Sequence, residues 1–350
     1  MFKRRTLFIV GAGAGFEVGM PTGFELAKRI VKLVDFKGAD QGPSPNNGDG
    51  DMIFLGQFHR RFGTVDAYRR AGWAIRDGVR LTHSIDDFLD MHNGNEMMQR
   101  MGKATIAQTI LAAETDSALF FNPYSTQETF NKIEATWFMK FFRMLGRGIN
   151  LGNAKEIFEP VSFIIFNYDR CVEHFLINSL SLVYTMPLED AASIVSDLNI
   201  IHPYGTVGDL PLLSSENPVP YGPLRGSDKF DYTILAERIK TYTEQIGDAD
   251  ETNAIRNEMR RAECIVFLGF GYHEQNLALL NPGEQLKSMP VFGTAHGFSG
   301  HNCEVVQQKI EGMFKPAPPK VIPRSPVVID REVTCSQLFD NYSQSLTAAK

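Results

Sequence analysis

The sequence predicts an α/β fold, a Rossmann-like doubly wound parallel sheet with a large all-helical insertion. Short apolar runs recur along the chain without polar alternation, which is typical of strands buried on both faces of a parallel sheet. Helical segments separate these runs, as in doubly wound sheets. The first run leads into glycines and then into a helix, in the stretch "TLFIVGAGAGFEVGMPTGFELAKRI" (6–30).

The first βα unit is the best-defined part of the pattern. We expect a strand over 6–10, a turn over 11–19 and a helix from about 22 to 34. Thr22 and Glu25 have the spacing of a capping box, which fixes the start of that helix. The following segment is rich in Gly, Pro, Asn and Asp, which indicates a loop over 36–51.

The middle of the chain shows helical patterns and no clear strand. The stretch 129–145 places Phe130, Ile133, Trp137, Phe141 and Leu145 along one stripe, which predicts a single buried helix. Later strands are expected within 161–169, 198–205, 264–271 and 289–295, and the helices between them within 170–183, 187–196, about 233–262 and 299–313. A proline-rich, extended stretch is expected over 315–326, and a last helix over 333–347.

These elements predict a division of the chain into three parts. Residues 1–37 and 159–330 form the Rossmann-like core, residues 38–158 form the helical insertion, and residues 331–350 form a C-terminal helix.

Composition excludes several classes of function. The 350 residues carry a formal charge of −6, so no basic face indicates a nucleic-acid partner. Four cysteines without a C-x-x-C pair argue against a thiolate zinc site and a disulfide framework, and no metal is predicted. No signal peptide or apolar run of ~20 residues is present, so we expect a cytoplasmic protein that does not enter a membrane.

Polar residues and glycines follow the predicted strands at the points where they end. In doubly wound sheets, ligands bind at the carboxyl ends of the strands. The residues at these ends are Gly11, Gly13, Gly15, Gly19, Asn167, Asp169, His202, Gly269, Gly271, Gly293 and Thr294. Their convergence on one rim predicts a ligand site.

The first glycine turn has the features of a phosphate cradle. Glycine lets the backbone approach an anion closely, and the N-terminus of the next helix offers unpaired N–H groups. A G-x-G-x-x-G fingerprint would need glycine where Phe16 stands, and the G-K-[ST] of a P-loop is absent. A tight strand-to-helix turn without a ligand remains the structural alternative.

Several motifs together resemble the sirtuin family. "GAGAGFEVGMP" (11–21) is similar to the sirtuin opening, with Gly11, Ala12, Gly13, Gly19 and Pro21 in register. "FNYD" (166–169) is similar to the sirtuin T-Q-N-I-D, "IHPYGT" (201–206) to the segment of the catalytic histidine, and "FLGFGYHEQN" (267–276) to the later glycine turn. The motifs occur in the family's order and cover roughly 1–35 and 160–300.

The chain also departs from the sirtuin deacetylases. Their four-cysteine zinc module is absent, and the D-F-R that follows G-I-P is replaced by Thr22, Gly23 and Phe24. The remaining likeness is to the sirtuin-like NAD glycohydrolases of bacterial anti-phage systems, which act by abortive infection. It implies NAD as substrate, with nicotinamide and ADP-ribose as products. It also implies a homo-oligomer that is activated within a complex, and allows a second defence protein such as a hexameric DNA-translocating ATPase as partner.

The resemblance and the chemistry together give a predicted site. Cleavage of the nicotinamide–ribose bond passes through an oxocarbenium-like centre. An amide at Asn167 can orient a water or ribose hydroxyl, and His202 can act as general base. Asp169 could stabilise the site, or equally cap the next helix. The predicted NAD-binding residues are Gly11, Ala12, Gly13, Ala14, Gly15, Gly19, Pro21, Thr22, Gly269, Phe270, Gly271 and Thr294.

Other interpretations remain open at this point. The site could be a catalytically silent module that binds NAD or ADP-ribose, or a sirtuin-type deacylase or ADP-ribosyltransferase. A flavin or nicotinamide oxidoreductase is disfavoured by the broken glycine fingerprint. Asp86 and Asp87 either serve as the acids that favour a helix N-terminus or contact the ligand.

Overall fold

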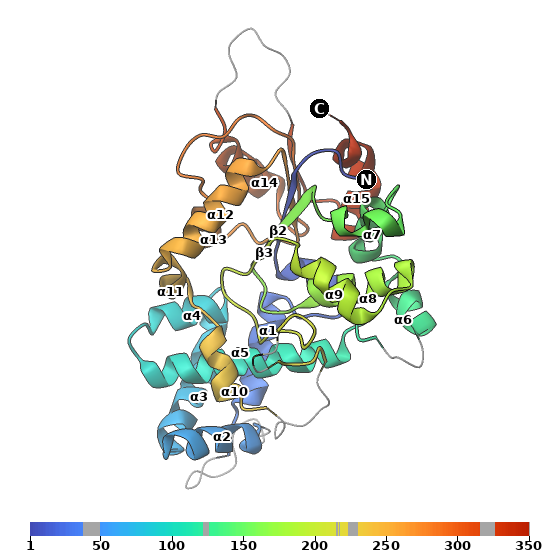
Figure 1. Ribbon diagram of the computed structural model, residues 1–350. Helices are drawn as coiled ribbons and strands as arrows, with labels where there is room; N and C mark the ends of the chain where they lie inside the picture. Colours follow the sequence, from blue (N-terminus) through green and yellow to red (C-terminus); the bar gives the residue numbers. More distant parts are fainter. Residues whose placement is uncertain are drawn as a thin grey trace.

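The computed structural model describes residues 1–37, 50–121, 126–214, 216, 218–222, 230–315 and 326–349. Its centre is a six-stranded sheet in the order β3-β2-β1-β4-β5-β6, and every pair of neighbouring strands is parallel. The predicted Rossmann-like α/β class is therefore confirmed. Figure 1 shows helices on both sides of the sheet and a group of helices beyond one end of it.

The strands lie where the apolar runs predict them but are shorter. Their bounds are Thr6–Val10 (β1), Val161–Ile165 (β2), Ile200–Ile201 (β3), Cys264–Leu268 (β4), Val291–Thr294 (β5) and Val327–Asp330 (β6). The edge strand β6 was not predicted. The chain adds strands on one side of β1 and then, from β4 on, on the other, so the strand order reverses between β1 and β4.

The helices follow the predicted alternation. The first group is Gly23–Leu33 (α1), Met52–Phe62 (α2), Asp66–Gly78 (α3), Ile85–Met91 (α4), Glu96–Asp116 (α5), Thr126–Ile133 (α6) and Trp137–Leu145 (α7). The second is Cys171–Tyr184 (α8), Leu188–Ser196 (α9), Tyr232–Leu235 (α10), Tyr242–Ile246 (α11), Ala249–Arg261 (α12), Glu274–Leu279 (α13), Gly300–Glu311 (α14) and Cys335–Thr347 (α15).

Short 3₁₀ helices complete the structure. They span Ala12–Val18 (η1), Val79–Leu81 (η2), Leu151–Glu156 (η3) and Ala236–Arg238 (η4). The predicted turn after β1 is therefore the 3₁₀ helix η1. The capping box at the start of α1 is present, with Thr22 as N-cap and Glu25 as its partner.

Two predictions of a single continuous helix are wrong, because the structure divides each stretch into shorter helices. The stretch 129–145 forms two helices, α6 and α7, and the first N–H of α7, that of Trp137, donates to Glu17 Oε2 at 2.8 Å. The stretch 233–262 is divided into α10, η4, α11 and α12. The expected proline-rich stretch falls largely on 316–325, which lie outside the described residues.

Between α1 and β2 the described residues form helices and no strand. Helices α2 to α5 lie together in the lower part of Figure 1, beyond the carboxyl ends of the strands. In contrast, α7 packs against α15 and α8 at the sheet. The segment predicted as one insertion therefore contributes helices at two places.

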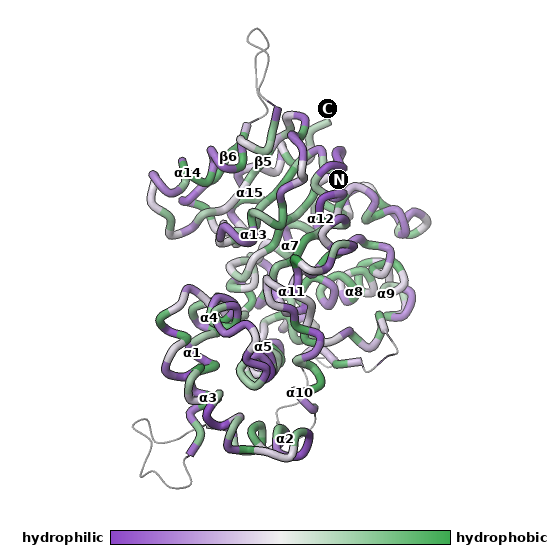
Figure 2. Tube along the Cα trace, turned by 90° about the vertical axis from the view of Figure 1, so that its left-hand side faces the viewer, coloured by the Kyte–Doolittle hydropathy of each residue, from purple (hydrophilic) through white to green (hydrophobic). Residues whose placement is uncertain are grey.

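An aromatic cluster joins α7 and α15 to one face of the sheet. The ring of Phe8 on β1 lies 5.1 Å from that of Phe141 on α7 and 5.2 Å from that of Phe163 on β2. Phe339 on α15 stacks on Phe8 at 6.3 Å. Figure 2 shows hydrophobic parts of the trace in the sheet and its flanking helices, and also in α2 and α4, whose buried residues belong to the same core.

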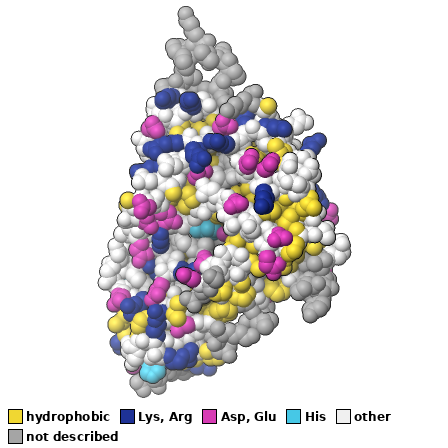
Figure 3. Space-filling model, in the orientation of Figure 1, with side chains coloured by type: hydrophobic (Ala, Val, Ile, Leu, Met, Phe, Trp, Pro, Cys, Tyr) yellow, Lys and Arg dark blue, Asp and Glu magenta, His cyan; other side chains and the backbone are white. Residues whose placement is uncertain are grey.

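The surface in Figure 3 carries acidic and basic side chains in mixed positions. Exposed apolar side chains lie near each other in the chain at the end of α8 and the start of α9, namely Leu182, Val183 and Leu188. None of the helices in the described part of the chain is long and apolar enough to span a bilayer.

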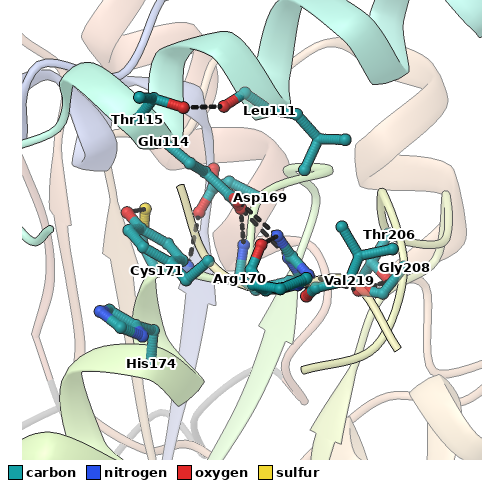
Figure 4. A network of polar contacts seen from close by, with 12 residues as sticks. Leu111, Glu114, Thr115, Asp169, Arg170, Cys171, His174, Thr206, Gly208 and Val219 are labelled. Carbon is teal, nitrogen blue, oxygen red and sulfur yellow. Dashed lines mark hydrogen bonds and ion pairs between the residues drawn. The ribbon is translucent and has the colours of Figure 1, made fainter. Parts of the chain in front are cut away.

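A buried ion pair ties α5 to the core (Figure 4). Arg170, at the start of α8, is 2% exposed, and Glu114 on α5 is 0% exposed. The guanidinium donates to both carboxylate oxygens of Glu114 and to the carbonyl oxygens of Gly208, Val219 and Pro220. The pair therefore fixes both α5 and the segment after β3 relative to β2.

Removing one partner of this pair should strongly destabilise the protein. In Glu114→Ala, Arg170 keeps its charge in a dry site without its carboxylate, which should cost about 3–5 kcal/mol of unfolding free energy. The matched control is Glu237→Ala, which breaks the exposed pair between Glu237 and Arg61 of α2 and should cost less than ~1 kcal/mol. Urea unfolding measures both. Equal losses in the two variants would contradict this view of the pair.

Candidate functional site

A cavity of about 570 Å³ opens at the carboxyl ends of β1 and β4. This is the point where the strand order reverses, and ligands of doubly wound sheets bind at such points. The volume lies within the range of about 300–1,000 Å³ typical of small-molecule sites.

The centre of the cavity is a close contact between two glycine turns. Gly13 N donates to Gly269 O at 3.0 Å, and Gly269 N donates to Thr294 Oγ1 at 2.8 Å. A Cβ on Gly11 would lie 2.6 Å from Gly269 O, and one on Gly269 would lie 2.0 Å from Ala14 N. Gly269 also has φ +55°, which disfavours any other residue. The glycines are therefore required by the contact of the two turns.

The structure divides the predicted NAD-binding residues into two groups. The residues that line the cavity are Gly11, Ala12, Gly13, Thr22, Gly269, Phe270, Gly271 and Thr294. The others, Ala14, Gly15, Gly19 and Pro21, are not among its lining residues and build the turn instead. Ala14 O accepts from Trp137 Nε1 at 2.8 Å, and Gly19 ends η1 with φ +87°.

Several N–H groups expected to bind phosphate are already used. Those of Gly13 and Gly269 have the partners given above, and Ala14 N donates to Gly11 O at 2.9 Å. These bonds hold the shape of the cradle, so a phosphate would depend on the remaining donors of the two turns.

Asn167 is the predicted catalytic residue that reaches the cavity. It follows β2, is 9% exposed and lines the cavity beside the first glycine turn. Its Nδ2 donates to Gly11 O at 3.2 Å. This bond fixes the orientation of the amide. Oδ1 is then the atom that can accept a hydrogen bond from a ligand.

Asp169 bonds the first turn of α8, close to the capping alternative that the sequence left open, although the N-cap position itself is Arg170. Asp169 Oδ1 accepts from Cys171 N at 3.1 Å in the first turn of α8, and Asp169 is not among the residues that line the cavity. Burial raises the pKa of its carboxyl, against the effect of the Cys171 hydrogen bond.

His202 lies behind Asn167 rather than in the cavity wall. Its Nδ1 is 3.2 Å from the carbonyl oxygen of Asn167, and its Nε2 is 2.8 Å from Glu173 Oε1 on α8. Burial alone would lower the pKa of His202, but the Glu173 carboxylate outweighs it and the pKa is raised. Both ring nitrogens are thus engaged, and the imidazole supports the backbone of Asn167.

The β2 side of the cavity includes Tyr204, which the sequence patterns did not select, and the two acids whose role the sequence left open. Tyr204, two residues after His202, lines the cavity, and its Oη donates to Asn276 Oδ1 at 2.5 Å. Asp86 and Asp87, the two acids in the first turn of α4, also line the cavity. Tyr168 Oη donates to Asp86 Oδ1.

The β5 side is built by another set of residues. Thr294 ends β5, and His296 and Phe298 follow it. The start of α15 adds Cys335, and the residues before it add Val333 and Thr334. Glu17 also lines the cavity, and its carboxylate accepts from Trp137 N and Ser336 N, each at 2.8 Å. The C-terminal part of the chain thus takes part in the site, which no local signal indicated.

No protein-family model matches the chain, and a comparison with curated proteins finds no significant match. The likeness to sirtuins therefore remains a prediction based on the motifs. Within the described residues, no three His, Cys, Asp or Glu side chains are grouped so that they could hold a metal ion. Asp35, two residues beyond the end of α1, pairs with Arg76 at 2.8 Å.

The glycine contact can be tested by a matched pair of variants. Gly269→Ala places a methyl against the backbone of Ala14, so it should separate the two turns and lower both stability and ligand binding. Gly23→Ala changes another glycine of the cavity wall that has open space around it and begins α1, so it should be neutral or slightly stabilising. Thermal unfolding and calorimetric titration with ADP-ribose measure the two effects. Equal behaviour would contradict the proposed constraint.

The His202–Glu173 pair should make stability depend on pH. Because folding raises the pKa of His202, its contribution is fully present below the unfolded pKa, about 6.5, and is lost as pH rises through the folded pKa. The difference in unfolding free energy between wild type and His202→Gln should therefore shrink from pH 6 to pH 9. Urea unfolding across that range measures it, and a difference that grows with pH would contradict the assignment.

Proposed function

We propose that the protein is an NAD glycohydrolase that cleaves NAD to nicotinamide and ADP-ribose. The observation that carries this proposal is the amide of Asn167, which lines a cavity at the strand-order reversal and is bonded to the glycine cradle. The cradle can approach a diphosphate closely, and the amide lies beside it, where the reacting ribose would be.

The two sides of the cavity support an orientation for NAD. The β2 side offers Asn167 and the carboxyl groups of Asp86 and Asp87, which can accept from ribose hydroxyls and favour the cationic nicotinamide ring. The β5 side offers the Thr294 and Phe298 region, which suits the adenosine. In this orientation the diphosphate lies over the contact between Gly13 and Gly269.

The chemistry assigned to the site is bond cleavage with capture by water. The C1′–N bond breaks, and its electron pair goes to the nicotinamide nitrogen, which becomes neutral. Positive charge develops on the ribose, as in glycoside hydrolysis. Asn167 Oδ1 accepts from the attacking water or from a ribose hydroxyl, while His202 and Glu173 hold the Asn167 backbone in place.

A second candidate function is a binding module without turnover. The engagement of both ring nitrogens of His202 favours it, since a general base needs a free nitrogen at the substrate. Such a module would bind NAD or ADP-ribose through the same cradle and release no nicotinamide. The proposed role in anti-phage defence, with an oligomer and an activating partner, depends on the sirtuin-like motifs alone.

Turnover of NAD separates the two functions. Purified protein, alone and in the assembly isolated from its own cells, is incubated with NAD and nicotinamide is quantified. Asn167→Ala should lower kcat by about 10²–10³-fold with little change in KM, because the amide acts mainly in the transition state. Asn302→Ala, an exposed amide on α14, is the control and should keep full activity. Binding of NAD without nicotinamide release by wild type would instead establish the binding module.

A further inference from the structure

Two acidic side chains of the cavity, Asp86 and Asp87, come from outside the sheet and its flanking helices. Asp86 lies in the first turn of α4, a helix between α1 and β2 that packs against α5, α1 and α11. Ser84 caps α4, and its side chain accepts from Asp87 N at 3.1 Å. The cap fixes the start of the helix, and with it the position of Asp86 in the cavity wall.

A tyrosine of the β2 end holds the Asp86 carboxyl. Tyr168 Oη donates to Asp86 Oδ1, and Tyr168 directly follows Asn167 in the chain. The ring of Tyr204, a further cavity residue, lies 6.5 Å from that of Tyr168. Asp86 is therefore on the same side of the cavity as the amide assigned to the reacting ribose.

The other acid–base groups of the site are less well placed to take a proton from the attacking water. Of the two acids of α4 in the cavity wall, the Tyr168 hydroxyl bonds Asp86 and not Asp87. Asp169 accepts from the first N–H of α8, and His202 is bonded at both ring nitrogens. His273 and His296 line the cavity but are exposed to solvent. Glu17 is bound by two backbone N–H groups on the β5 side.

We propose that Asp86 is the general base of the reaction. This inference rests on the proposed NAD glycohydrolase function. The water oxygen bonds to C1′ as the C1′–N bond breaks, and the electron pair of that bond leaves with neutral nicotinamide. The proton of the water passes to the Asp86 carboxylate and then to solvent. The helices before β2 thereby supply a catalytic residue, and Asn167 orients the water that Asp86 deprotonates.

The surroundings of Asp86 adjust its basicity for neutral pH. Burial raises the pKa of the Asp86 carboxyl to about 6, although the Tyr168 hydrogen bond opposes this shift. A base with a pKa near the working pH is the most effective. The charged and titratable groups that act on it are Asp87 and Asp90 on α4, together with Tyr168 and Tyr204. Glu244 on α11, which pairs with Lys103 of α5, acts on Asp90.

The test combines rate, pH profile and stability. Wild-type kcat should rise with pH to a plateau, with a midpoint near pH 6. Asp86→Asn should lower kcat by about 10²–10⁴-fold and lose this rise, with KM little changed. Asp86→Glu should keep a pH-dependent rise and recover part of the rate. Asp90→Asn, on the same helix but bonded to Thr243 rather than facing the cavity, should keep the wild-type plateau rate and the rise with pH. Its midpoint should move to lower pH, because the Asp90 carboxylate is one of the charges that raise the pKa of Asp86.

Stability provides a readout that does not need activity. Asp86→Asn removes a carboxylate that burial disfavours, so its melting temperature at pH 8 should exceed that of wild type. A lower melting temperature, or an Asp86→Asn protein that fails to fold, would contradict the environment on which the proposal depends.

The outcomes separate this inference from the proposed function. If wild type releases nicotinamide and Asp86→Asn does so within about threefold of the wild-type rate, the inference is overturned and the proposed function stands. If the rise near pH 6 is lost in His202→Gln but kept in Asp86→Asn, His202 is the base. If wild type releases no nicotinamide, both fall.

Discussion

The contact between two glycine turns is the constraint on which the rest of the structure depends. Backbone meets backbone where β1 and β4 end, and a single methyl on Gly11 or Gly269 would occupy space that the other turn fills. The side chains of the site are attached to this contact: Asn167 bonds Gly11 O, and Thr294 bonds Gly269 N. A ligand over the contact would therefore meet groups from β2 on one side and from β5 on the other.

The helices between α1 and β2 are part of the site rather than an addition to it. Glu114 on α5 holds Arg170, three residues beyond Asn167, in a fully buried pair. Asp86 on α4 is held by Tyr168, the neighbour of Asn167. Both links reach the same short segment after β2. Displacement of α4 or α5 would thus act on the segment that carries the Asn167 amide, which gives the proposed activation within a complex a physical route.

Features set by neighbouring residues could be predicted from the sequence, and those set by distant partners could not. The strands β1 to β5, the capping box at Thr22 and the glycine turns follow from local pattern, whereas the edge strand β6 was not predicted. The break before α7 depends on Glu17, which is 120 residues away in the chain. The orientation of the His202 ring depends on Glu173 of α8. Asp86 was recognised as a helix-opening acid, but only its contact with Tyr168 places it at the β2 end.

The orientation of NAD in the cavity tests the central claim most directly. The measurement is a crystal structure of the Asn167→Ala protein with NAD, in which slow turnover preserves the substrate. We expect the diphosphate over the turns of Gly13 and Gly269, the nicotinamide ribose beside Asp86 and position 167, and the adenosine towards Phe298. NAD bound with its adenosine beside Asp86, or bound outside this cavity, would contradict the assignment of the β2 side as the place where the bond is cleaved.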